Sequence, residues 1–180
     1  MINEKYNIEI KLRIKDIEKD VWNNLAKKLD NPFYEWEWLL NLEISKSVSQ
    51  KTGWQPLYFL LYLDKELHGI APLFLKNHSY GEFIFDQSFA RLAQDLNLAY
   101  YPKLIGMSPY SPIEGYQFIY KENSDKIEVT EILLKNIEAF ATKNNILSCN
   151  FLYIDKEWEK LLTQYNYHKW INIRLSLIHI

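Results

Sequence analysis

Cysteine is almost absent: Cys149 is the single cysteine in a chain of 180 residues. No disulfide can form within the chain, so a core of apolar side chains must hold the fold. Low cysteine use is typical of reducing compartments, and we predict a cytoplasmic location. Cys149 stands in an apolar stretch, which favours a place in the core over a role as a nucleophile.

A strongly basic character and long apolar runs are also missing. The formal net charge is −2, so charge alone gives no reason to expect a nucleic-acid backbone as partner. The longest apolar runs, such as residues 57–63, are far shorter than the roughly 20 residues that a membrane helix needs. Residues 1–5 show no apolar segment behind a basic start, and no signal peptide is expected.

Several common site motifs do not occur. The sequence contains no GxSxG, no Walker loop and no GxGxxG. His68, His78 and His168 lack metal-ligand spacing, so we expect neither a metal site nor a permanently bound cofactor.

Hydrophobic periodicity predicts an alternation of strands and helices. The predicted strands cover residues 8–14, 57–63, 68–76, 100–107 and 147–154, and one more begins within 167–174. The predicted helices cover residues 16–29, 34–46, 127–143 and 157–165, and a further helix runs from 86 to about 96 with an apolar face of Phe89, Leu92, Ala93 and Leu96. We interpret 57–76 as an antiparallel hairpin and 147–154, apolar on both faces, as a central strand. The fold class is then α/β (α+β): one domain with a mixed sheet and helices on both faces.

The densest group of polar and aromatic residues lies at 76–86. If this stretch is extended, His78, Tyr80 and Glu82 share one face because side chains alternate along a strand. An imidazole, a phenol and a carboxylate together could supply base and acid to an amine nucleophile. A purely structural hydrogen-bonded network at a strand end fits the same spacing.

A second group surrounds the loop at 108–115. It follows the stretch 100–103 and combines hydroxyls and prolines with a closing glycine, Gly115. Such a loop can present backbone N–H groups to an anion, although proline removes donors. A rigid structural loop is the alternative, and Lys103 either pairs with a phosphate or caps the sheet edge.

Six segments stand in the order and spacing of one family. They are Phe33 with residues 39–43, then Thr52-Gly53-Trp54-Gln55-Pro56, Ala71-Pro72-Leu73-Phe74-Leu75-Lys76, His78-Ser79-Tyr80-Gly81-Glu82-Phe83-Ile84-Phe85-Asp86, Tyr100-Tyr101-Pro102-Lys103-Leu104 and Ser111-Pro112-Ile113-Glu114-Gly115. The chain, over roughly residues 8–174, resembles the FemAB-like predicted N-acyltransferases of the GNAT superfamily, often described as peptidoglycan biosynthesis or recognition proteins.

The resemblance implies a GNAT-like, mostly antiparallel sheet and a donor slot where two central strands splay apart. The loop after the fourth strand normally holds the pyrophosphate of acyl-CoA, and residues 108–115 take that place here. They depart from the usual Q/R-x-x-G-x-G/A pattern, whereas Ser111 keeps the hydroxyl of a common threonine. FemAB-type relatives use aminoacyl-tRNA, so acyl-CoA and aminoacyl-tRNA are both implied donors.

The implied reaction is acyl transfer to the amine of a small molecule or peptide. The expected base is Glu82 or His78, and the expected acid is Tyr80 or Tyr101. Residues expected to bind the donor are Lys103, Ser111 and Gly115, and those expected to contact the acceptor are Lys76, Ser79, Asp86 and Trp54. The alternative is a binding module without catalysis that recognises a peptidoglycan or lipid-linked precursor.

Family members are about twice as long as this chain and carry two GNAT-like halves. We therefore expect residues 1–174 to be an N-terminal half whose sheet is incomplete at its C-terminal end and whose partner is the missing second half. Residues 175–180 look like the translation of a sequencing adapter and are expected to be a non-native tail.

Overall fold

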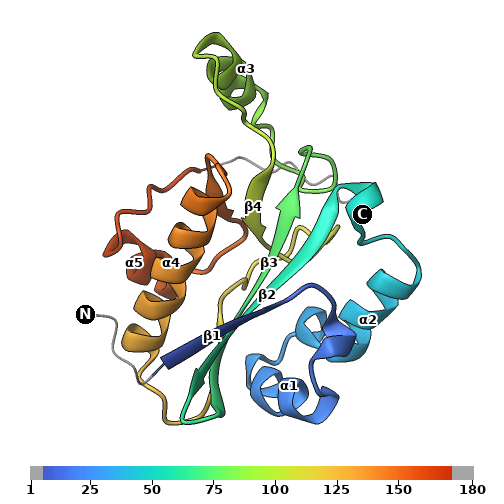
Figure 1. The fold of residues 1–180 in the computed structure, drawn as a ribbon, viewed down its shortest axis with the longest axis vertical. Coiled ribbons are helices and arrows are strands. Elements are labelled where there is room, and N and C mark those ends of the chain that lie inside the picture. The colour runs from blue at the N-terminus through green and yellow to red at the C-terminus, as the bar shows by residue number, and fades with distance from the viewer. Residues whose placement is uncertain (1–5, 172–180) are drawn as a thin grey trace, which may run out of the picture.

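The computed structural model describes residues 6–171. Its elements, in chain order, are β1 (Tyr6–Lys11), α1 (Lys19–Ala26), α2 (Trp36–Ile44), β2 (Trp54–Leu63), β3 (Glu66–Lys76), α3 (Gln87–Asp95), β4 (Lys103–Gly106), β5 (Ile119–Tyr120), α4 (Lys126–Lys143), β6 (Cys149–Phe151) and α5 (Lys156–Thr163). Most of the predicted elements are present (Figure 1); β2, β3 and α4 are longer than predicted, whereas the others are shorter.

The sheet is mixed and mostly antiparallel, as predicted. Its order is β1-β2-β3-β4-β6, with the short β5 paired beside β3. Strands β1 to β4 pair antiparallel, whereas β6 runs parallel to β4. The β2–β3 hairpin begins at the Trp54↔Lys76 pair, which brings an aromatic ring and a lysine together at one end of the sheet.

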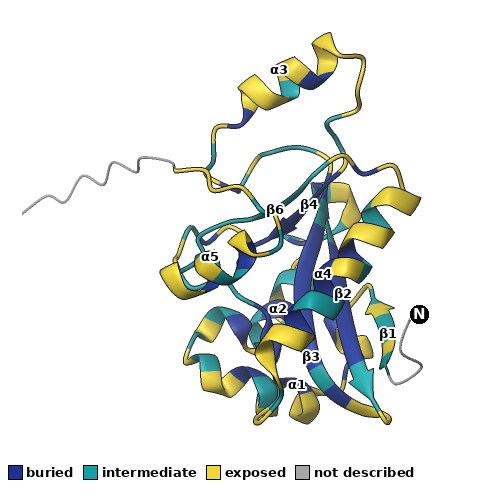
Figure 2. Cartoon of the chain, turned by 90° about the vertical axis from the view of Figure 1, so that its left-hand side faces the viewer, coloured by how far each residue is buried: buried dark blue, intermediate teal, exposed yellow. Residues whose placement is uncertain are grey.

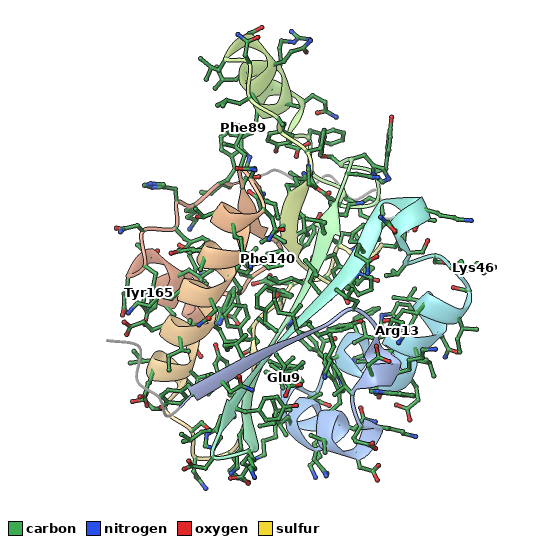
Figure 3. All side chains as sticks on the ribbon, in the orientation of Figure 1. Glu9, Arg13, Lys46, Phe89, Phe140 and Tyr165 are labelled. Carbon is green, nitrogen blue, oxygen red and sulfur yellow. The ribbon has the colours of Figure 1, made fainter. Side chains whose placement is uncertain are left out.

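Helices cover both faces of the sheet. Tyr58 and Phe59 are neighbours in β2 and point to opposite faces. The Tyr58 ring contacts Trp22 of α1 at 5.4 Å. The Phe59 ring contacts Phe140 at 5.5 Å, and Figure 3 labels Phe140 on α4. Both strand residues are fully buried, so the core lies in two layers, one on each side of the central hairpin.

The expectations for the C-terminal part of the chain differ in outcome. Strand β6 pairs with β4 alone among residues 6–171, so within that range it ends the sheet and is not central. Residues 167–171 form no strand, and 172–174 fall outside the described residues, as does the expected tail at 175–180.

Helix α3 forms as predicted, but its apolar face is not buried. It stands beyond the end of the sheet, and most of its surface is exposed (Figure 2). Phe89, Leu92 and Leu96 are 41%, 54% and 59% exposed, while Ala93 is buried. Within residues 6–171, the ring contact on this face is Phe89 with Trp170, at 5.0 Å between centroids.

No helix in the described range is long and apolar enough to cross a bilayer.

Candidate functional site

The segment between β3 and α3 is a turn, which overturns the premise of an extended strand. Gly81 has φ +82° and Phe83 has φ +58°, so both lie in the left-handed region. A Cβ on Gly81 would lie 2.8 Å from the Tyr110 ring and 3.2 Å from the Trp54 ring. Glycine permits both the backbone conformation and the close approach, and the turn separates the predicted His78, Tyr80 and Glu82 trio.

His78 sits at the side of this turn with both ring nitrogens engaged. Its Nε2 lies 3.0 Å from the carbonyl of Thr52, which can only accept, so Nε2 carries the proton. Its Nδ1 accepts from the Tyr80 N–H at 3.1 Å. Burial, and then the charge of Lys76, lower the pKa of His78 and favour the neutral ring. Tyr80 turns outward and is 81% exposed.

Glu82 turns inward instead, into a buried charge cluster that we call the lysine–carboxylate cluster: Lys103, Glu82 and Asp86. Lys103 Nζ donates to Glu82 Oε2 at 2.7 Å and also to Asp86 Oδ2. Lys103 and Glu82 are each 1% exposed, and Asp86 is 6% exposed. One carboxylate oxygen of each acid, Glu82 Oε1 and Asp86 Oδ1, has no hydrogen-bond partner within the described residues. Buried polar atoms without partners are uncommon, and they mark this cluster as a candidate site.

A chain of hydroxyl groups leads outward from the cluster. Ser79 Oγ donates to Asp86 Oδ2 at 2.9 Å and lies 2.8 Å from Tyr101 OH. Lys103 Nζ lies 2.8 Å from the same Ser79 Oγ. Tyr100 OH donates to Asp86 Oδ2 at 2.7 Å. The predicted site residues Ser79, Asp86, Lys103, Glu82 and Tyr101 therefore come together, although they do so in a turn and not along a strand.

The two acids of the cluster titrate differently. Burial raises the pKa of Glu82, and the attraction of Lys103 only partly offsets this effect. Burial also acts to raise the pKa of Asp86, but hydrogen bonds from Lys103, Tyr100 and Ser79 outweigh it and lower that pKa. Two carboxyl groups whose pKa values are pushed apart can take the roles of proton acceptor and fixed anion.

Lys76 lies opposite Lys103 across the β3–β4 ladder and is also fully buried. Its Nζ donates to the Tyr80 carbonyl at 3.0 Å, lies 3.4 Å from His78 Nδ1 and sits 3.7 Å from the Trp54 ring centroid. Burial lowers the pKa of Lys76 to about 8. Trp54, which was expected to contact the acceptor, is fully buried beneath this ammonium group as a cation–π partner.

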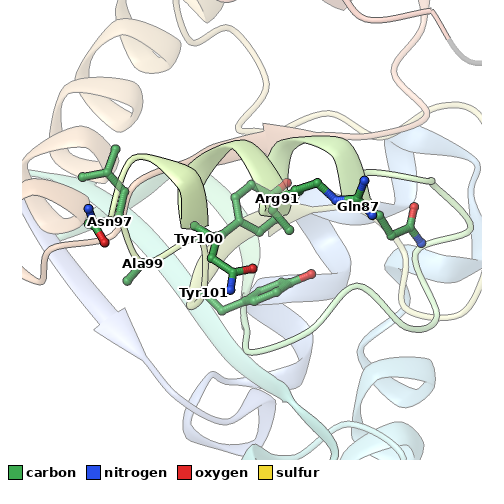
Figure 4. Close-up of a pocket in the computed structure, with 9 residues that line it drawn as sticks. Gln87, Arg91, Asn97, Ala99, Tyr100 and Tyr101 are labelled. Atoms are coloured by element: carbon green, nitrogen blue, oxygen red, sulfur yellow. The ribbon is translucent and has the colours of Figure 1, made fainter.

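A pocket of about 720 Å³ lies between α3 and the tyrosine pair that precedes β4 (Figure 4). Its lining is Gln87, Ala90, Arg91, Gln94, Asn97, Leu98, Ala99, Tyr100 and Tyr101. Tyr100 and Tyr101 are thus shared between the pocket and the hydroxyl chain. A ligand in this pocket would reach the buried cluster through their phenol groups.

The loop after β4 uses its N–H groups internally. The N–H groups of Ser111 and Ile113 donate to Ser108 and Ser111 carbonyls within the loop, and the Ser111 hydroxyl donates to the Pro109 carbonyl. Gly115 and Tyr116 donate their N–H groups to the Tyr153 carbonyl at 2.7 and 3.1 Å. Ser111 and Gly115 therefore do not form an open anion cradle in this structure.

The donor slot implied by the resemblance is filled by this chain itself. Strands β4 and β6 pair as far as Gly106↔Phe151, and beyond that point Gly115 and Tyr116 bond to the continuation of β6 at Tyr153. The Tyr116 ring covers Gly106, where an added Cβ would lie 2.5 Å away, and stacks on Phe151 at 6.0 Å. Tyr116 OH donates to the Pro72 carbonyl at 2.8 Å. These residues do not fit a CoA arm between the two strands.

Some residues of the site could not be singled out from the sequence. Tyr153 links β6 to the cluster, because its hydroxyl donates to the Glu82 carbonyl at 2.7 Å. Arg91 and Tyr116 gave no signal, since neither stands in a recognisable motif. Tyr100 did have a signal, as the neighbour of Tyr101 before Lys103. No group of three His, Cys, Asp or Glu suited to a metal occurs among residues 6–171.

Comparisons with known proteins identify the fold. A possible acetyltransferase from Clostridium difficile superposes with a TM-score of 0.56 at 14% identity, covering 98% of this chain and 100% of that one. A ribosomal-protein-alanine N-acetyltransferase from Brucella melitensis gives 0.55 at 9% identity, covering 96% of this chain and 99% of that one. An aminoglycoside N-acetyltransferase in complex with CoA gives 0.50 at 11% identity over 100% of both chains. These likenesses show the GNAT acetyltransferase fold.

The family is shown by a sequence comparison. No curated protein matches the chain. The family model for FemAB-like proteins, described as peptidoglycan biosynthesis/recognition, matches residues 13–178, which include the whole hairpin, the turn at 77–86 and β4. The chain therefore belongs to the FemAB-like family of peptidoglycan biosynthesis/recognition proteins.

Proposed function

We propose that this domain takes part in N-acyl transfer, moving an acyl or aminoacyl group to a primary amine of a cell-wall precursor. One observation carries the proposal: the buried lysine–carboxylate cluster is joined through Ser79 to Tyr101, which lines an open pocket. Family membership and the acetyltransferase fold support the reaction class.

The chemistry requires proton transfer at two points. An ammonium group must lose a proton before its nitrogen attacks the acyl carbon, and the leaving oxygen must gain one when the C–O bond breaks. Glu82 is suited to accept the first proton through water, because burial raises its pKa and its Oε1 has no partner among the described residues. Tyr101 is suited to protonate the leaving oxygen from the pocket side. The second proton of the original ammonium group goes to solvent, and transfer of the proton held by Glu82 to the Tyr101 phenolate restores both groups.

The other residues of the site hold these two groups. Lys103 and Asp86 fix Glu82 and Ser79 by direct hydrogen bonds, so we assign them positioning roles. His78 is a weaker choice as base than Glu82, because its Nδ1 already accepts from the Tyr80 N–H. The filled gap between β4 and β6 favours a donor ester that approaches from the pocket over a CoA arm between the strands.

A mass-spectrometric assay tests the proposal. The protein is incubated with a peptidoglycan precursor that carries a free amine, together with alanyl-tRNA or acetyl-CoA, and acylation of the amine is followed. We expect Glu82→Gln to lower the rate by about 100-fold or more, in line with the loss of a general base. The control is Glu159→Gln, an acid that pairs with Lys169 on the surface, which should leave the rate unchanged. Full activity of Glu82→Gln would remove Glu82 from the base role.

The second candidate function is recognition of a precursor without catalysis. It is favoured by one observation: the Tyr116 ring packs on Gly106 and Phe151 and fills the space between β4 and β6. Titration calorimetry with acetyl-CoA and with a muropeptide, combined with the mass-spectrometric acylation assay, separates recognition without catalysis from N-acyl transfer. Muropeptide binding without acyl transfer from either donor supports recognition, whereas acylation of the amine rejects it.

A further inference from the structure

Helix α3 presents its polar face to the pocket and its apolar face to solvent. Gln87, Ala90, Arg91 and Gln94 are spaced i, i+3, i+4 and i+7, so they share one face, and all four line the pocket. Phe89, Leu92 and Leu96 lie on the opposite side and are exposed. The polar face of α3 therefore supplies the pocket with amide and guanidinium groups, and Ala90, Leu98 and Ala99 add apolar surface between them.

The pocket contains one charged side chain, and it is a cation. Arg91 contributes a guanidinium group, and no carboxylate lies within ion-pairing distance of it among residues 6–171. Three neutral amides, Gln87, Gln94 and Asn97, surround the same pocket. A guanidinium group without a partner is suited to bidentate pairing with a carboxylate, and amides add hydrogen bonds of both kinds.

The opposite wall of the pocket consists of two phenols that are hydrogen-bonded to polar side chains. Tyr100 and Tyr101 are joined by their hydroxyls to Asp86 and Ser79, and hence to the carboxylates of the cluster. Phenol oxygens attract a ligand ammonium group, and aromatic rings favour a cation near their faces. Arginine on one side and tyrosines tied to acids on the other side match a ligand with one charge of each sign.

We propose that the α3 pocket is the acceptor subsite and takes an amino acid or short peptide that carries both a free amine and a free carboxylate. The carboxylate pairs with Arg91, and this fixes the amine towards Tyr101. The assignment of the amine end rests on the proposed function, whereas the assignment of the carboxylate end rests on Arg91 alone. The pocket volume of about 720 Å³ lies in the range of small-ligand sites.

Direct binding measurements test the subsite without requiring turnover. The probes are the tripeptide Ala-Lys-Ala with a free carboxyl terminus and the same tripeptide as its C-terminal amide, both titrated by calorimetry. We expect the free acid to bind the wild-type protein at least tenfold more tightly than the amide. Arg91→Gln should abolish this preference, while Arg13→Gln, whose native guanidinium pairs with Asp16 outside the pocket, should retain it.

Three results would overturn the proposal: equal affinity for acid and amide in the wild type, retention of the preference in Arg91→Gln, or no binding of either probe. Arg91 is exposed, so its substitution should leave the unfolding transition unchanged. A carboxylate preference without any acyl transfer would leave the subsite standing and reject the proposed function. Acyl transfer with no carboxylate preference would reject the subsite and leave the proposed function standing.

Discussion

At the scale of single residues, Lys103 has the most consequential environment. It is 1% exposed and shares its ammonium group between two acids that are themselves buried. A buried ion pair adds little net stability compared with apolar side chains of the same size, because desolvation offsets the attraction. Removing one partner is different, since it leaves the other charges buried and uncompensated.

We therefore predict that Lys103→Met destabilises the protein by about 3–5 kcal/mol, the usual cost of breaking a buried ion pair. Urea unfolding at pH 7 measures the change. The control is Lys169→Met, which removes a surface ion pair and should cost at most about 1 kcal/mol. A loss below about 1 kcal/mol for Lys103→Met would mean that the cluster is open to water.

Lys76 gives a prediction of pH dependence. Burial lowers its pKa in the folded protein to about 8, below the ordinary value of 10.5. Between these two values the unfolded chain binds more protons than the folded one, so this residue makes stability rise with pH. The buried thiol of Cys149, with its pKa raised to about 12, has the opposite sign. A comparison with Lys76→Met cancels the thiol contribution.

The expected outcome is that the wild type gains about 2 kcal/mol relative to Lys76→Met between pH 7.5 and 9.5. Urea unfolding of both proteins across this range provides the measurement. A constant difference between them would show that Lys76 has an ordinary pKa.

At the scale of elements, α3 and α4 contrast in how far their sequence patterns determine their packing. Both helices were predictable from periodicity. The apolar side chains along one face of α4, such as Leu133, are buried. The sequence placed the apolar residues of α3 on one side of the helix, and the structure does so too. Periodicity cannot tell whether that side packs against the protein. Which side meets the protein depends on what the rest of the chain supplies, and here the tyrosine pair lies under the polar side.

The contrast predicts different tolerance to substitution. Leu92→Gln on α3 should change stability by no more than about 0.5 kcal/mol, because the leucine is 54% exposed. Leu133→Ala on α4 should cost about 2–5 kcal/mol, because the leucine is fully buried. Thermal or urea unfolding of the two variants checks this. If Leu92→Gln proves as costly as Leu133→Ala, the apolar face of α3 is covered in solution.

At the scale of the whole molecule, the sequence predicted the mixed sheet, the hairpin and the helices on both faces. These features follow from local periodicity and from short connections, which constrain topology strongly. The resemblance placed Ser79, Glu82, Asp86, Tyr101 and Lys103 in one site, and the structure brings them together. The route differs, because Gly81 and Phe83 reverse the backbone by positive φ angles that alternation cannot reveal.

The filled donor slot was beyond sequence reasoning for a similar reason. Gly115 and Tyr116 meet Tyr153 across a long stretch of chain, and their hydrogen bonds exist only in the folded molecule. The unusual loop composition signalled a departure from the usual donor loop. Only the packing of Tyr116 on Gly106 identifies what takes the place of the donor.

The central claim is that the buried cluster acts on substrate through the hydroxyl of Tyr101. The most direct test is the acylation rate of Tyr101→Phe, which removes one oxygen and keeps the ring. Tyr165→Phe serves as the matched control, because its hydroxyl donates to the Ile127 carbonyl on the surface. We predict a rate about 100-fold lower for Tyr101→Phe, whose unfolding transition should be unchanged. The rate of the control should equal that of the wild type. Equal rates for Tyr101→Phe and the wild type would contradict the account.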